Sequence, residues 1–287
     1  MSERTTLLFD NGSLLPAATR RLRALARELA GRINVPVAPV SLLHSSGVPA
    51  ELLDGVAAEI LEPALQRRLA AGNSEFLVVP LFFGPSGALT DYLPARVTHL
   101  RQSHPGLRVR LAPPLFQAGD GRLAEILAGQ VQRILAAMER GSAPGPEPMR
   151  VALVDHGSPV RAVAEVRDQL AAQVGTRLGA AFKVAPCSME RRPGAAYDFC
   201  EPLLAGLLRQ PGWNSGPVVV AMQFLLPGRH AGPEGDVAKI CREAEIASGG
   251  ALRTAMTGLV AEHPLLVEIL VDRWRQAAEW DALSADL

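Results

Sequence analysis

The chain has 287 residues and a formal net charge of zero, with 29 basic and 29 acidic side chains. This length fits two units of about 140 residues better than one domain. The balanced charge disfavours a nucleic-acid surface or a polybasic membrane anchor, so we expect neither nucleic acid nor membrane among its partners.

The start of the chain, MSERTTLLFD, lacks the apolar stretch of a signal peptide. No run of about 18 apolar residues predicts a transmembrane helix. The three cysteines form no CxxC pair, which is typical of reduced thiols. We therefore expect a cytoplasmic protein.

The first half of the chain predicts apolar strands alternating with amphipathic helices. We expect strands near residues 5–10, 35–43, 75–83 and 108–113, with helices between them. Residues 141–148 read GSAPGPEP, whose glycines and prolines disfavour both helix and central strand. We interpret residues 141–149 as a linker.

The second half predicts the same alternation. We expect strands near residues 150–155, 181–188, 217–225 and 251–257, and helices near 160–178, 198–209, 236–247 and 264–280. The strands are continuous apolar runs, a pattern typical of parallel strands that are buried on both faces.

The two halves repeat each other. Residues 6–13 read TLLFDNGS and residues 151–158 read VALVDHGS, each an apolar strand followed by an aspartate and a Gly-Ser turn. A repeat of a whole domain predicts tandem copies at 1–140 and 150–287. Each copy should be a flavodoxin-like α/β domain, a four-stranded parallel sheet with helices on both faces. We expect a pseudo-twofold axis to relate the copies.

Polar side chains follow the strands of the second copy. The candidate site residues are, in chain order, His156, Ser158, Glu190, Arg191, Arg192, Gly228, Arg229 and His230. Ligands bind beyond the carboxyl ends of parallel strands, so these residues should gather at one sheet edge. Two imidazoles and a carboxylate can hold a divalent transition metal, and arginines bind carboxylates. The pattern therefore indicates a metal that is transferred to a polycarboxylate.

Other interpretations of these residues stay open. A histidine after a strand is often a hydrogen-bonded structural residue, and Arg191 and Arg192 could be a solvated pair. The Gly157-Ser158 turn could bind an anion at a helix start. However, Pro159 follows it and the GxGxxG spacing of a dinucleotide site is missing.

These motifs resemble the class II tetrapyrrole chelatases of the sirohydrochlorin cobaltochelatase and ferrochelatase type. The matching residues are His156-Gly157-Ser158, Glu190, Gly228-Arg229-His230 and Asp236. The resemblance implies that His156 and His230 hold the metal. It further implies that Glu190 assists metal placement or accepts pyrrole protons, and that two lobes receive the tetrapyrrole in a cleft.

The copies depart from the family pattern in different ways. In the first copy Asn11 stands for His156 and Gly87 for His230, while Leu43 or His44 stands for Glu190. That copy should therefore have lost the metal histidines. In the second copy the spacing before Asp236 is about two residues longer than expected, so Glu234 could take its place. His44 could point into the cleft from the first lobe.

We therefore expect a chelatase of siroheme or cobalamin biosynthesis that inserts cobalt or iron, with nickel as another candidate. The metal is a substrate. This chemistry requires no nucleotide or redox cofactor, so none is expected, and the sequence offers no Walker-A loop. A monomer with two lobes, or else a homodimer, would suit this role. The alternatives are a non-catalytic protein that binds or delivers metal or tetrapyrrole, and a regulatory pseudoenzyme.

Overall fold

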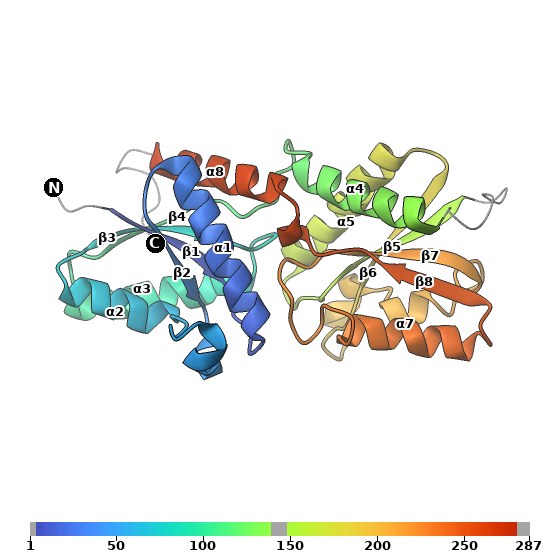
Figure 1. Ribbon diagram of the computed structural model, residues 1–287, viewed down its shortest axis with the longest axis horizontal. Coiled ribbons are helices and arrows are strands. Elements are labelled where there is room, and N and C mark those ends of the chain that lie inside the picture. The colour runs from blue at the N-terminus through green and yellow to red at the C-terminus, as the bar shows by residue number, and fades with distance from the viewer. Residues whose placement is uncertain (1–3, 139–147, 280–287) are drawn as a thin grey trace. The chain divides into compact units, whose positions relative to one another are not determined.

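The computed structural model describes residues 4–138 and 148–279 (Figure 1). The chain forms two compact units. Unit 1 comprises Met1–Gln117 and Pro264–Leu287, and unit 2 comprises Ala118–His263. Each unit contains one four-stranded, all-parallel sheet.

The sheet of unit 1 has the strand order β2-β1-β3-β4. Its strands are β1 (Thr5–Asp10), β2 (Val37–Ser41), β3 (Glu75–Pro80) and β4 (Arg108–Leu111). Successive residues Leu7, Leu8 and Phe9 of β1 are all fully buried. Because neighbouring residues of a strand point to opposite faces, both faces of this sheet must be covered.

Four helices cover the sheet of unit 1. They are α1 (Pro16–Ile33), α2 (Leu61–Ala70), α3 (Leu93–Ser103) and α8 (Leu265–Ala278). One face packs against α2 and α3 in a core cluster with Leu7, Phe9 and Val78. On the opposite face, α8 contacts both α1 and β3.

Unit 2 repeats this architecture with the strand order β6-β5-β7-β8. Its strands are β5 (Met149–Asp155), β6 (Phe182–Ser188), β7 (Gly216–Met222) and β8 (Leu252–Met256). Its helices are α4 (Arg122–Met138), α5 (Arg161–Leu178), α6 (Leu204–Leu207) and α7 (Asp236–Ala247). One face of this sheet packs against α6 and α7. Helix α4 contacts β7, and helix α5 contacts β6. The predicted pair of flavodoxin-like α/β units is confirmed.

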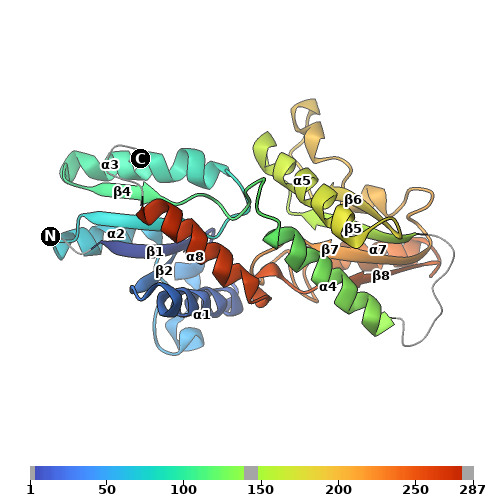
Figure 2. The ribbon, with the colours of Figure 1, turned by 90° about the horizontal axis from the view of Figure 1, so that it is seen from above.

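The units differ from the predicted domains of 1–140 and 150–287 by one helix each. Helix α4 follows the last strand of the first repeat but belongs to unit 2, and α8 follows the last strand of the second repeat but belongs to unit 1 (Figure 2). Both helices are amphipathic, and their apolar faces are buried in the unit that receives them. The predicted linker at 141–149 lies almost entirely outside the described residues.

Short elements complete the fold. The 3₁₀ turns are Ser45–Gly47, Ala50–Leu53, Ala195–Cys200 and Val260–Glu262, and one π-helical turn spans Ala88–Tyr92. The helix predicted near 198–209 is therefore a 3₁₀ turn followed by the single turn of α6. Over the ranges 4–138 and 148–279, no helix is long and apolar enough to cross a membrane.

Candidate active site

His156 sits in a tight turn directly after β5. Gly157 has φ +93°, and a Cβ atom at this position would overlap the carbonyl oxygen of Glu190. Only glycine tolerates both the left-handed backbone and this close approach. The His156 Nδ1 lies 2.8 Å from the carbonyl oxygen of Gly157. A carbonyl can only accept, so Nδ1 donates and Nε2 is the ring nitrogen left to bind a ligand.

His230 approaches His156 from the loop after β7. The two rings are T-shaped, with centroids 4.7 Å apart and an interplanar angle of 72°. The Nδ1 of His230 donates to Oδ2 of Asp236, the first residue of α7, at 2.8 Å. The Lys239 ammonium and then His230 hold the pKa of Asp236 below its usual range. The carboxylate therefore orients His230 so that its Nε2 is also available as a ligand.

Glu190 completes the group of predicted catalytic residues. Its backbone N–H donates to the carbonyl of His156 at 3.1 Å, and its Oε1 lies 3.5 Å from Nε2 of His156. The side chains of His156 and Glu190 are 47% and 59% exposed, so a ligand can reach both from solvent. The structure thus brings His156, His230 and Glu190 to one edge of one sheet.

This arrangement is open rather than a closed metal cage. Among the described residues, no group of three or more His, Cys, Asp or Glu side chains is placed to hold a metal ion. The site offers two imidazoles, with a carboxylate beside one of them. Catalytic metal sites characteristically leave coordination positions free, and a metal that must be handed on needs such positions.

The predicted arginines differ in what they can offer an anion. Arg191 is held by Glu201 at 2.8 Å and Asp198 at 3.0 Å, so its charge is already neutralised. Arg192 is exposed and lies over the ring of Tyr197. The side chain of Arg229 is 85% exposed, 3.6 Å from the carboxylate of Asp236.

The two other predicted contact residues shape turns. The Ser158 hydroxyl accepts the N–H of Val160 at 3.1 Å, just before α5 begins. Gly228 exchanges backbone hydrogen bonds with Ala231 and closes the turn that carries Arg229 and His230.

The structure distinguishes Asp236 from Glu234. Glu234 is 89% exposed and pairs with Arg242 at 3.4 Å, whereas Asp236 bonds directly to His230. The backbone N–H groups of Asp236 and Val237 donate to the carbonyls of Arg229 and His230, so the start of α7 lies against the His230 turn.

A buried polar network beneath the site was not predicted from the sequence. Asp155 is 5% exposed and Arg167 is 1% exposed. Arg167 Nη1 donates to the Ser188 hydroxyl, which donates to Asp155 Oδ1, and both distances are 2.6 Å. Burial raises the pKa of Asp155, and the Ser188 hydrogen bond and the Arg167 charge act in the opposite direction. The sequence signal that could have revealed this network is an arginine at a position where the amphipathic pattern of 160–178 calls for an apolar residue.

The equivalent edge of unit 1 can be aligned residue by residue through the sheet. Asp10 pairs with Ser41 as Asp155 pairs with Ser188. The N–H of Leu43 bonds to the carbonyl of Asn11, as that of Glu190 bonds to His156. Leu43 is therefore the counterpart of Glu190. The choice between Leu43 and His44 is resolved, and His44 corresponds to Arg191.

The predicted match of Gly87 with His230 needs a correction. Leu81 bonds to Phe9 of β1 as Gln223 bonds to Val154 of β5. Counting on from these pairs places Ala88, rather than Gly87, opposite His230. Neither residue can ligate a metal, so unit 1 lacks both imidazoles.

Unit 1 presents apolar side chains near this edge instead. Five of the six exposed large hydrophobic residues in the described part of the chain belong to unit 1, namely Leu14, Leu15, Leu43, Leu52 and Val56. They follow β1 and β2 directly or lie in the next loop. The edge that carries His156 and His230 in unit 2 is thus partly apolar in unit 1.

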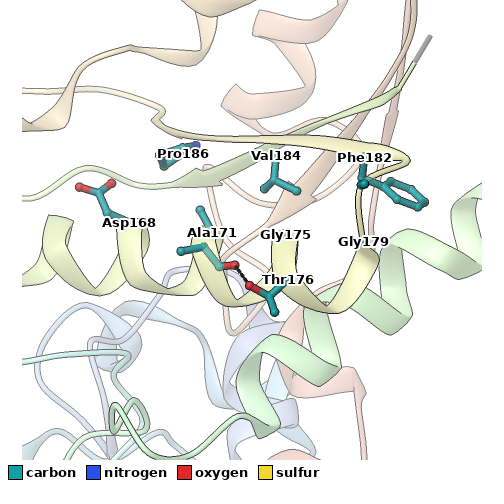
Figure 3. Close-up of a pocket in the computed structure, with 10 residues that line it drawn as sticks. Asp168, Ala171, Gly175, Thr176, Gly179, Phe182, Val184 and Pro186 are labelled. Atoms are coloured by element: carbon teal, nitrogen blue, oxygen red, sulfur yellow. Dashed lines mark hydrogen bonds between the residues drawn. The ribbon is translucent and has the colours of Figure 1, made fainter.

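Two cavities lie in unit 2. One, of about 620 Å³, borders the His230 loop and is lined by Pro227, Pro233, Arg242, Glu245 and Glu262 among others. The second, of about 580 Å³, runs between α5 and β6 and is lined by Ala171, Gly175, Phe182 and Val184 (Figure 3). None of the predicted site residues lines the second cavity.

The fold is that of the chelatases. SirB from Bacillus subtilis with Fe³⁺ superposes with a TM-score of 0.68 at 16% identity, covering 96% of each chain. SirB from Bacillus subtilis subspecies spizizenii in complex with cobalt gives 0.66 at 14% identity, again over 96% of each chain. CbiX, the terminal enzyme for siroheme biosynthesis in denitrifying bacteria, gives 0.55 at 20% identity, covering 98% of this chain and all of that one.

The first repeat also matches a family model. Residues 5–134 match the family model CbiX. No curated protein matches the chain. The predicted resemblance to the class II chelatases, in two tandem copies, is confirmed by the family match of the first repeat and the chelatase fold of the chain.

Proposed function

We propose that the chain inserts a divalent metal, Co²⁺ or Fe²⁺, into sirohydrochlorin or a related polycarboxylate tetrapyrrole, and that unit 2 holds the metal. One observation carries the proposal. His156 and His230 both use Nδ1 as a donor, so both Nε2 lone pairs remain for a metal. Their rings lie 4.7 Å apart, and the Glu190 carboxylate is 3.5 Å from one of them.

Metal insertion exchanges the ligands of the ion and removes two protons from the ring. The imidazoles of His156 and His230 replace water on the metal while leaving positions for the pyrrole nitrogens. As the nitrogens bind the metal, the two N–H protons leave. Glu190 accepts them one at a time and passes each to solvent, to which its side chain is open. No nucleotide or redox chemistry is involved.

The exposed arginines favour a ring with many carboxylates. Arg192 and Arg229 both present guanidinium groups at the surface of unit 2. Exposed charge pairs contribute up to about 1 kcal/mol each, enough to bias the choice of tetrapyrrole without defining it. Arg191 contributes less, since it is neutralised by Asp198 and Glu201.

Unit 1 contributes ring binding rather than metal binding in this proposal. Its edge has lost the imidazoles and the carboxylate and exposes leucines such as Leu14 and Leu43. Apolar side chains gain free energy when a conjugated ring covers them.

The test is an absorbance assay of insertion into sirohydrochlorin, with Co²⁺, Fe²⁺ and Ni²⁺ in turn. We expect His156→Ala and His230→Ala each to lower the insertion activity by more than roughly 10- to 100-fold. That range is the typical cost of removing only the hydrogen-bond partner of a metal ligand. Asn11→Ala, the matched control in unit 1, should stay within twofold of wild type. An equal loss of activity in Asn11→Ala would mean that the proposal places the metal in the wrong unit. Binding of ring and metal without turnover would favour a delivery protein.

A further inference from the structure

Arg167 is a fully buried arginine that no step of the proposed chemistry uses. It lies on α5 and is 1% exposed. Its Nη1 donates to the Ser188 hydroxyl at 2.6 Å and to the Cys200 carbonyl at 3.2 Å, and its Nη2 donates to the Phe199 carbonyl at 3.0 Å. Its guanidinium also pairs with Asp168 at 2.7 Å.

These contacts lead to both sides of the candidate active site. The Ser188 hydroxyl donates to Asp155 Oδ1, which also accepts the N–H of Gly157 at 3.1 Å. His156 lies between Asp155 and Gly157, and Glu190 follows Ser188 by two residues. One guanidinium therefore links the ends of the two strands that carry His156 and Glu190.

Unit 1 shows that the fold does not need this arginine. Helices α1 and α5 each have 18 residues, and each begins six residues after the aspartate that ends its strand. This register places Leu22, which is 2% exposed, where Arg167 stands. Asp10 and Ser41 remain buried there, but Oδ1 of Asp10 has no hydrogen-bond partner among the described residues.

A purely structural role for Arg167 is therefore a weak explanation. Burying a guanidinium carries a large desolvation cost, and well-packed apolar residues often stabilise a fold as well or better. The same position in the same chain is filled by a leucine in the unit without imidazoles. The arginine is present in the unit that has the two histidines and absent from the unit that has the same fold without them.

We propose that Arg167 is a positioning residue that fixes the His156 turn relative to Glu190 for metal binding and transfer. The proposal rests on the proposed function of this site. The loss of a hydrogen-bond partner behind a metal ligand typically costs about 10- to 100-fold in metal affinity or activity, and Arg167 acts on the ligand through Ser188 and Asp155.

The test measures Co²⁺ binding to the full chain, without tetrapyrrole, by titration and by the visible absorption of the bound ion. Arg167→Met keeps much of the side-chain volume and removes the donors. The matched control is Arg273→Met, since Arg273 is also 1% exposed and donates to the Pro114 and Leu115 carbonyls of unit 1. Ser188→Ala breaks the same link with a smaller change.

We expect Arg167→Met and Ser188→Ala to bind Co²⁺ about 10- to 100-fold more weakly, with a changed spectrum. Arg273→Met should lower the unfolding temperature but keep the wild-type affinity and spectrum. Wild-type Co²⁺ binding in Arg167→Met would overturn the proposal. If Arg167→Met does not fold, Ser188→Ala decides in the same way. If His156→Ala also binds Co²⁺ normally, the proposed metal site itself has failed.

Discussion

Asp10 of unit 1 is a buried acid whose ionisation should destabilise the protein. It is 6% exposed, and burial raises its pKa from 3.8 to about 6. Hydrogen bonds from Ser41 and Gly12 offset only part of this cost. Its counterpart in unit 2, Asp155, has an arginine nearby, but in unit 1 the apolar Leu22 occupies the position of that arginine.

The sign and size of the effect follow from proton linkage. Below pH 3.8 the carboxyl is protonated in both the folded and unfolded states, so it does not affect their balance. Between pH 3.8 and about 6 the unfolded chain releases the proton while the folded protein retains it. Stability therefore falls as the pH rises through this window. A shift of roughly two pKa units corresponds to about 3 kcal/mol, which is lost by pH 7.

Urea unfolding at intervals from pH 4 to pH 7.5 measures this contribution. We expect Asp10→Asn to remove the contribution of residue 10 to the pH slope and to be more stable than wild type at pH 7.5, by up to about 3 kcal/mol. Asp54→Asn is the matched control, since the Asp54 side chain is 79% exposed, and it should keep the wild-type slope. An Asp10→Asn profile parallel to that of wild type would refute the assignment of a raised pKa.

Three further predictions concern the site. Glu190→Gln should bind ring and metal but insert metal about 10²- to 10⁴-fold more slowly in single-turnover assays, because an amide cannot accept the proton; a rate within twofold of wild type would remove it from the mechanism. Asp236→Asn should weaken Co²⁺ binding about tenfold by titration, because His230 loses its charged partner; unchanged affinity would mean that this hydrogen bond does not orient the ligand. Leu43→Ser should reduce tetrapyrrole affinity about fivefold in fluorescence titrations and leave Co²⁺ affinity unchanged, since partial burial of a leucine is worth about 1 kcal/mol; weaker Co²⁺ binding would contradict the division of roles between the units.

Much of the architecture could be predicted because it depends on local patterns. Continuous apolar runs such as the one in β7 predict parallel strands buried on both faces. The Asp-His-Gly-Ser turn follows directly from one of them, so its position at the carboxyl edge follows from the fold. The grouping of His156, Glu190 and His230 at one edge could be derived in the same way.

The exchange of α4 and α8 could not be predicted in this way. An amphipathic helix carries a pattern for burial against some sheet, but the pattern does not identify which one. Two similar sheets in one chain offer similar surfaces, and a repeat in the sequence suggests that each copy keeps its own helices. The choice depends on the three-dimensional path of the connections after β4 and β8.

The polar details were hidden for a related reason. Sequence spacing shows which residues are near a strand end but not which partners neutralise them. Arg191 follows β6 like Arg192, yet Asp198 and Glu201 of the next turn bind it. Asp236 lies farther along the chain than Glu234, yet the turn brings it to His230.

The most direct test of the central claim is to locate the metal. Crystals soaked with Co²⁺ and measured at the cobalt absorption edge would give an anomalous difference peak at the bound ion. We predict a peak in unit 2 within about 2.0–2.2 Å of Nε2 of both His156 and His230, the usual length of a bond between a divalent metal and imidazole. A principal peak at the edge of unit 1 that carries Asn11 and His44, or none near the two histidines, would contradict the account.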